Sequence, residues 1–84
     1  MAERMEERLL ELLERFRARL PAVDYTHVRE MLVHREWGIG LEDLCTQLFE
    51  HSIPVDVAEL ETIRELAAKM NLPADTWDFL AEGV

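Results

Sequence analysis

Residues 41–49 read LEDLCTQLF, and the apolar members of this stretch recur at the i, i+3, i+4, i+7 and i+8 positions of a helix. The spacing predicts a helix over residues 40–51 with one buried stripe, formed by Leu41, Leu44, Cys45, Leu48 and Phe49. Alternation of apolar and polar residues, which would indicate a strand, extends nowhere over a useful length. The sequence therefore predicts an all-helical protein.

A second helix is expected upstream, between Asp24 and a turn at residues 36–40. Asp24 is suited to cap it, with Val23 and Val28 placed as a hydrophobic staple around the cap. The turn is predicted because two glycines fall within five residues, and each weakens a helix by about 1 kcal/mol.

The first helix is expected over residues 3–19, before Pro21, because proline disfavours helical geometry in the residue that precedes it. Its apolar stripe also has the spacing of a coiled coil, so this helix is a candidate seam for a homodimer. The residues of that seam are Met5, Leu9, Leu12 and Phe16.

Two helices are expected downstream. Asp56 and Glu59 have the spacing of a capping box for a fourth helix, and Asn71 is suited to the left-handed position after its end. A last short helix is expected over residues 75–82. The predicted architecture is a compact bundle of four helices plus a short C-terminal fifth, in one domain over residues 1–84, with neighbouring helices antiparallel.

Charge is distributed unevenly along the chain. The 84 residues carry 9 basic and 18 acidic side chains, a formal charge of −9. Residues 1–35 are balanced, with seven Arg and seven Asp or Glu, whereas residues 36–84 hold only Arg64 and Lys69 against eleven acids. The acidic half argues against nucleic acid and anionic membranes as partners, since both require Lys and Arg. It fits a basic protein partner, and it fits equally a face that serves only solubility.

Location and chemistry can also be addressed from the sequence. The N-terminus lacks the apolar stretch of a signal peptide, and a single cysteine fits a reducing compartment, so a cytoplasmic protein is expected.

His27, Glu30 and His34 share one helix face and could bind zinc, although exposed histidines are the commoner outcome. Cys45 lies in an apolar stripe and is expected to be inert, and Ser52 beside His51 is a poor nucleophile–base pair. We expect no enzyme activity, no metal and no cofactor.

One stretch has a familiar pattern. His-Arg-Glu-Trp-Gly at 34–38 precedes Leu-Glu-Asp-Leu-Cys at 41–45, Ile-Pro follows at 53–54, and the tail contains Met-Asn-Leu-Pro at 70–73 and Thr-Trp-Asp-Phe-Leu at 76–80. This pattern resembles the MafI family of bacterial immunity proteins over most of the chain after the first helix. Two features depart from it: Gly40 stands where the family usually has Ala, and the helix ends in Phe-Glu-His-Ser without the expected Tyr and Asp.

The resemblance implies a small acidic helical protein that neutralises a cognate secreted polymorphic toxin of the contact-dependent inhibition type. Many such toxin domains are nucleases with basic clefts, which an acidic face can enter or neighbour. Trp37 and Trp77 are either core residues or aromatic anchors of an interface. The alternative function is a homo-oligomeric helical adaptor. We expect partner contacts to be drawn from Glu36, Trp37, Glu42, Asp43, Glu50, Asp56, Asp75 and Asp78.

Overall fold

The computed structural model describes residues 2–83, with side chains for residues 4–82, and contains no strand in that range. Its elements are α1 (Ala2–Arg15), α2 (Ala22–Val33), α3 (Trp37–Glu50), α4 (Val57–Lys69) and the 3-10 helices η1 (Ala74–Thr76) and η2 (Asp78–Gly83). The predicted all-helical bundle of four helices with a short C-terminal fifth segment is confirmed. The fifth segment is two 3-10 turns and not one α-helix.

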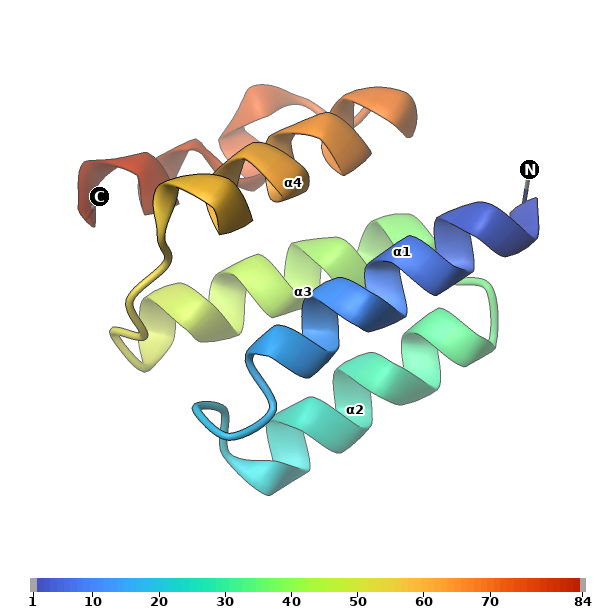
Figure 1. Ribbon diagram of the computed structural model, residues 1–84, viewed down its shortest axis with the longest axis horizontal. Helices are drawn as coiled ribbons and strands as arrows, with labels where there is room; N and C mark the ends of the chain where they lie inside the picture. The colour runs from blue at the N-terminus through green and yellow to red at the C-terminus, as the bar shows by residue number, and fades with distance from the viewer. Residues whose placement is uncertain (1, 84) are drawn as a thin grey trace.

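The helices alternate in direction along the chain, and α1 contacts all three others (Figure 1). Helix α2 packs against α1 and α3, and the chain then returns through α4 on the other side of α1. The C-terminal segment η1–η2 runs back beside α4 and contacts α3 as well. Helix α3 is therefore covered by helices on one side and by the 3-10 segment on another.

One apolar stripe from each helix forms the core. The fully buried side chains include Leu9, Leu13 and Phe16 from α1 and the turn after it, Val28 and Leu32 from α2, Leu41, Leu44, Cys45 and Leu48 from α3, and Ile63, Leu66 and Ala67 from α4. Phe49, the last member of the predicted α3 stripe, is an exception, because 57% of it is exposed. At 100° per residue Phe49 lies about 80° around the helix from Leu41, at the edge of the stripe.

Helices α2, α3 and α4 end in the same way. Arg35, Ser52 and Asn71, each one residue past a C-cap, have φ values of 65°, 52° and 57°. In every case the next N–H donates to a carbonyl five residues back, as Glu36 does to Met31 at 2.9 Å and Ile53 to Leu48 at 2.9 Å. These are Schellman ends, built here without glycine. The left-handed position predicted for Asn71 is confirmed; those of Arg35 and Ser52 carry no comparable signal in the sequence.

The first two helix boundaries differ from the prediction. Helix α1 ends at Arg15 and not at 19, because the following N–H groups bond three residues back and tighten the chain into a turn. Helix α2 begins at Ala22, directly after Pro21, whose φ of −56° already suits a helix start. Asp24 is therefore not the cap but lies in the first turn, and Val23 is no staple, since 74% of it is exposed.

The predicted turn at residues 36–40 is also wrong. The turn lies at residues 34–36, and α3 begins at Trp37, so both glycines are helical. Gly40 is buried against α2: a Cβ there would stand 2.6 Å from Cδ2 of Leu32. A close approach of the two helices, and not a chain reversal, explains the glycine at this position.

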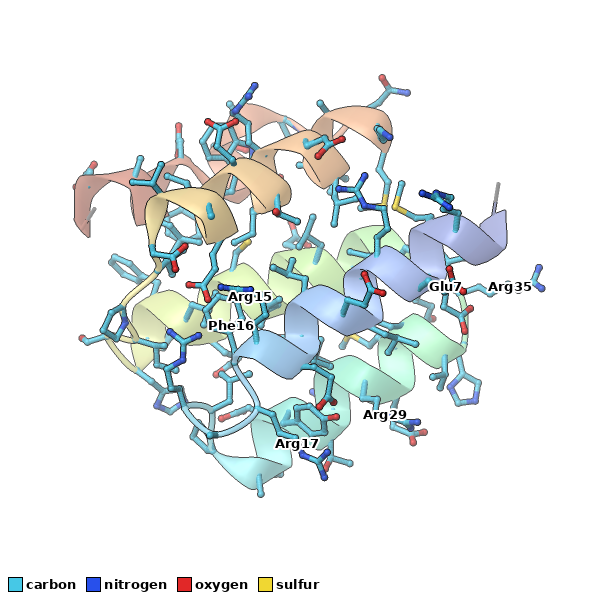
Figure 2. All side chains as sticks on the ribbon, in the orientation of Figure 1. Glu7, Arg15, Phe16, Arg17, Arg29 and Arg35 are labelled. Atoms are coloured by element: carbon cyan, nitrogen blue, oxygen red, sulfur yellow. The ribbon has the colours of Figure 1, made fainter. Side chains whose placement is uncertain are left out.

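Glu59 joins α1 to α4. Only 3% of this residue is exposed, and its Oε2 accepts from Nε of Arg15 at 3.1 Å and from Nη2 of Arg19 at 2.9 Å. Arg19 also donates to the carbonyl of Pro54 at 3.0 Å. Figure 2 shows Arg15 at the end of α1 on the side of α4, whereas Arg17 and Arg29 lie toward α2. The arginines near the end of α1 thus hold the bundle together.

Candidate protein-binding face

Two hollows lie side by side along α3 and share Phe79 of η2. The first has a volume of about 350 Å³ and is lined by Ile39, Glu42 and Asp43 of α3, with Asp75 beside them. The second has a volume of about 460 Å³ and is lined mainly by apolar residues of α3, the α3–α4 loop and η2. We call this combined surface the Phe79 groove. It brings an acidic hollow and an apolar hollow onto one face.

Apolar side chains stand exposed along this groove. Phe49 and Ile39 are 57% and 56% exposed, and the Phe49 ring meets Phe79 edge to face with centroids 5.3 Å apart. Helix α3 therefore has two apolar sides: its core stripe and an outward side that carries Ile39 and Phe49. Exposed aromatic side chains beside a hollow are typical of surfaces that another molecule covers.

Most acids around the groove, Asp43 excepted, form no ion pair in the described range. In the part of the chain that the structure describes, no ion pair involves Glu42, Glu50, Asp75, Asp78 or Glu82. The acids of α4 differ, since Glu59, Glu61 and Glu65 all pair with Arg or Lys. The negative charge of the later half is thus neutralised on α4 and left unneutralised along α3 and the C-terminal segment.

Asp43 is held more firmly than the other rim acids. Its Oδ1 accepts from Nε2 of Gln47 at 3.3 Å, and its Oδ2 lies 3.6 Å from Nδ1 of His27 on α2. Oδ2 is buried and has no hydrogen-bond partner in the described chain. Glu42 and Asp75 are exposed, so they are the carboxylates of the first hollow that a partner reaches first.

The structure brings three of the eight predicted contact residues, Glu42, Asp43 and Asp75, into the groove. Glu36, Glu50 and Asp78 are exposed but line neither hollow.

The other two predicted residues have structural partners. Asp56 caps α4: its Oδ1 accepts from the Glu59 N–H at 2.7 Å. In return, Oε1 of Glu59 accepts from the Asp56 N–H at 3.1 Å. Trp37 is half-buried, packs against the core and donates from Nε1 to the carbonyl of Leu32 at 3.1 Å. Trp77 is also half-buried against the core. The predicted capping box is confirmed, and both tryptophans take the core side of the alternatives that the sequence left open.

The apolar half of the groove is not predicted from the sequence. The pattern predicts Ile39 in a turn and Phe49 in the core, and it indicates no role for Phe79. The helical wheel contains part of the signal, because Ile39, Glu42, Thr46 and Phe49 fall within one 80° sector when spaced at about 100° per residue. Phe79 reaches the same sector only through the return of the C-terminal segment over α3, which no local pattern encodes.

The residues considered for chemistry are not gathered together. His34 bonds within its own helix, its Nδ1 lying 2.7 Å from the Glu30 carbonyl, whereas His27 faces Asp43 on α3. No group of three or more metal-ligating side chains occurs in the part of the chain that the structure describes. Cys45 is buried, and burial together with the charge of Glu42 raises the pKa of its thiol to about 12. At neutral pH this thiol is not a nucleophile.

The proposed dimer seam on the first helix lies inside the monomer. Leu9, Leu12 and Phe16 are at most 2% exposed, and only Met5 of that stripe is half-buried. A further hollow of about 230 Å³, lined by Arg4, Met5, Arg8 and Lys69, lies where α1 begins and α4 ends. Two of its three cations already share the carboxylate of Glu65, which pairs with Arg8 at 2.9 Å and with Lys69 at 3.8 Å.

None of the helices in the described range has both the length and the apolar character needed to cross a membrane. The candidate protein-binding face is the Phe79 groove, with the exposed Phe49 ring and with Glu42 and Asp75, which form no ion pair in the described range. Comparison with protein-family models, with curated proteins and with solved structures gives no significant match to this chain.

Proposed function

We propose that this protein is a cytoplasmic immunity protein that neutralises a cognate secreted polymorphic toxin by tight stoichiometric binding. The toxin domain is expected to be basic, as nuclease domains are, and to meet the acidic α3 face. Catalysis plays no part in this proposal, since the protein acts by covering a surface of its partner.

One observation carries the proposal: the Phe79 groove joins exposed apolar side chains to Glu42 and Asp75, which form no ion pair in the part of the chain that the structure describes. Burying Phe49 and Ile39 supplies affinity, because apolar area removed from water contributes about 25 cal/mol per Å². Glu42 and Asp75 supply orientation and attraction for a basic partner. The resemblance of residues 34–54 to the MafI pattern supports the biological role.

The role is tested by growth. The C-terminal domain of the secreted toxin encoded beside this protein is induced in cells that contain or lack this chain. We expect growth to be restored by this chain and not by an unrelated acidic helical protein of similar size. Continued arrest, with both proteins well expressed, would contradict the proposed function.

A matched pair of variants ties rescue to the groove. Asp75→Lys reverses a charge in the first hollow, and Val23→Ser changes an equally exposed position on α2, away from the groove. We expect weaker rescue with Asp75→Lys and full rescue with Val23→Ser. Circular dichroism of the two variants confirms that both remain folded, so that a difference in rescue reports on binding.

A further inference from the structure

The two halves of the Phe79 groove differ in character, and their order along α3 defines a pattern. Toward the start of α3 lie Ile39, Glu42 and Asp43, with Asp75 opposite them. Toward its end lies the hollow between Phe49, Phe79 and the α3–α4 loop, where Ile53 and Val55 are buried. A molecule that fills both hollows must therefore present a cation to the first and an apolar group to the second.

We propose that the Phe79 groove docks a single basic amphipathic segment of the partner protein. The segment seats one large apolar side chain in the second hollow, against Phe49 and Phe79, and it places Lys or Arg against Glu42 and Asp75. This inference rests on the proposed function, because it names the part of the toxin that the immunity protein binds.

Charge selects this occupant over a second copy of the same chain. Two copies joined through this face would oppose Glu42, Asp75 and Glu82 to one another, and like charges held together disfavour the complex. No Arg or Lys lines either hollow, so the same face of a second copy would bring no such cation to offset them. A basic partner meets no such conflict.

The geometry also selects an apolar anchor over charge alone. Phe49 and Phe79 stand edge to face at an interplanar angle of 76°, and both line the hollow of about 460 Å³. A further aliphatic or aromatic side chain in this hollow would pack against aromatic rings. A segment with cations only would leave this hollow filled with water and Phe49 exposed.

The test uses a short amphipathic probe peptide built of Leu, Phe and Lys at helical spacing. The peptide is titrated into the full chain while backbone amide resonances are followed by NMR. We expect the largest shifts in residues 39–49 and 75–82. A peptide of the same pattern with Glu in place of Lys should not bind, and a scrambled Leu, Phe and Lys peptide should bind more weakly.

Three variants locate the contact. Phe49→Ser removes the exposed ring, Asp75→Lys reverses the rim charge, and Val23→Ser is the control on α2. We expect Phe49→Ser and Asp75→Lys each to raise the dissociation constant of the probe about tenfold, and Val23→Ser to leave it unchanged. Phe49 is mostly exposed and the acidic position is on the surface, so both variants should fold, as thermal melts would show.

Several outcomes would overturn the inference. One is that the Lys probe does not bind. Another is that the NMR shifts it causes map to α1 and α2. A third is that neither Phe49→Ser nor Asp75→Lys changes the dissociation constant of the probe. Self-association of the chain alone, abolished by Phe49→Ser, would assign the groove to a second copy instead.

The growth assay separates this inference from the proposed function. Full rescue by variants that no longer bind the probe would support the immunity role and show that the groove is not needed for it. Binding of the probe at the groove without rescue leaves the docking surface standing and removes the immunity role.

Discussion

Glu59 takes part in four hydrogen bonds, two with its capping partner Asp56 and two with arginines at the end of α1 and in the turn after it. It completes the capping box with Asp56 and accepts from Arg15 and Arg19, while only 3% of it is exposed. The sequence predicted the capping box, because its two members are three residues apart. The arginine contacts were not predictable, since they join positions about forty residues apart that meet only when α4 folds onto α1.

The charge of Glu59 should make stability depend on pH. Burial raises the pKa of this carboxyl, but hydrogen bonds from the Asp56 N–H, Arg19 and Arg15 outweigh burial, so its pKa in the folded protein is below the usual value. A lowered folded pKa means that the stabilising contribution is present at neutral pH. It is lost as the pH falls from the unfolded value through the folded one.

We expect Glu59→Ala to lower the free energy of unfolding at neutral pH by about 2 kcal/mol, since it removes the cap and the charged hydrogen bonds together. Glu59→Gln keeps an amide oxygen for one bond and should lose less. Urea unfolding at about pH 7 and about pH 3 checks the contribution of the Glu59 charge. The difference in free energy of unfolding between wild type and Glu59→Gln should be smaller at the acidic pH. A difference that does not change with pH would show that the charge is not its cause.

At the scale of elements, the two glycines of α3 form a natural matched pair. A Cβ on Gly40 would stand 2.6 Å and 3.3 Å from Cδ2 and Cγ of Leu32, which is buried in the core and cannot withdraw freely. A Cβ on Gly38 would meet only Leu72 Cδ2, at an ordinary 3.5 Å. Helix propensity alone would favour alanine at both positions.

We therefore expect alanine to stabilise the protein at position 38 and to destabilise it at position 40. Gly38→Ala should raise the free energy of unfolding by about 0.5 kcal/mol, from helix propensity. Gly40→Ala should lower it by about 1 kcal/mol, because overpacking against Leu32 exceeds the propensity gain. Thermal unfolding of the two variants measures the difference. Equal stabilisation by both would mean that α2 and α3 can separate without cost.

The left-handed ends of α2 and α3 are held by residues that disfavour that conformation. Arg35 and Ser52 have φ values of 65° and 52°, a region that costs an ordinary L-residue about 1–2 kcal/mol. Their Schellman hydrogen bonds hold them there. The position of these ends was predictable only at Asn71, because asparagine tolerates this region and signals it in the sequence.

Arg35→Gly and Ser52→Gly should each raise the free energy of unfolding by about 0.5 kcal/mol, as relief of the left-handed strain exceeds the entropy cost of glycine. The control is Ala68→Gly, at an exposed position in the last turns of α4. This variant should lower the free energy of unfolding by about 1 kcal/mol. Denaturant midpoints of the three variants distinguish the cases. A loss of stability in Arg35→Gly or Ser52→Gly would show that the native residue is not strained at that position.

At the scale of the whole molecule, the fold rearranges the charge asymmetry of the sequence. Arginines of α1 and of the turn after it pair with acids of α4, as Arg8 does with Glu65 and Arg19 with Glu59. Among the acids of the later half, those on α3 and the C-terminal segment other than Asp43 form no ion pair in the described range. The sequence predicted an acidic later half and named Glu42, Asp43 and Asp75, but it could not divide that half into a paired and an unpaired face. Only the packing of helices distant in sequence makes that division.

This division predicts how a partner arrives. Acids without an ion pair along α3 and the C-terminal segment would attract the proposed basic toxin at long range and orient it, so the association rate should fall about tenfold from low to high salt. Stopped-flow mixing over a range of salt concentrations measures this slope. The double variant Asp75→Lys/Asp78→Lys should flatten the slope and weaken binding, whereas Phe49→Ser should mainly speed dissociation, because its contact forms after encounter. An association rate that does not respond to salt would remove electrostatic steering and leave the apolar hollow as the sole source of affinity.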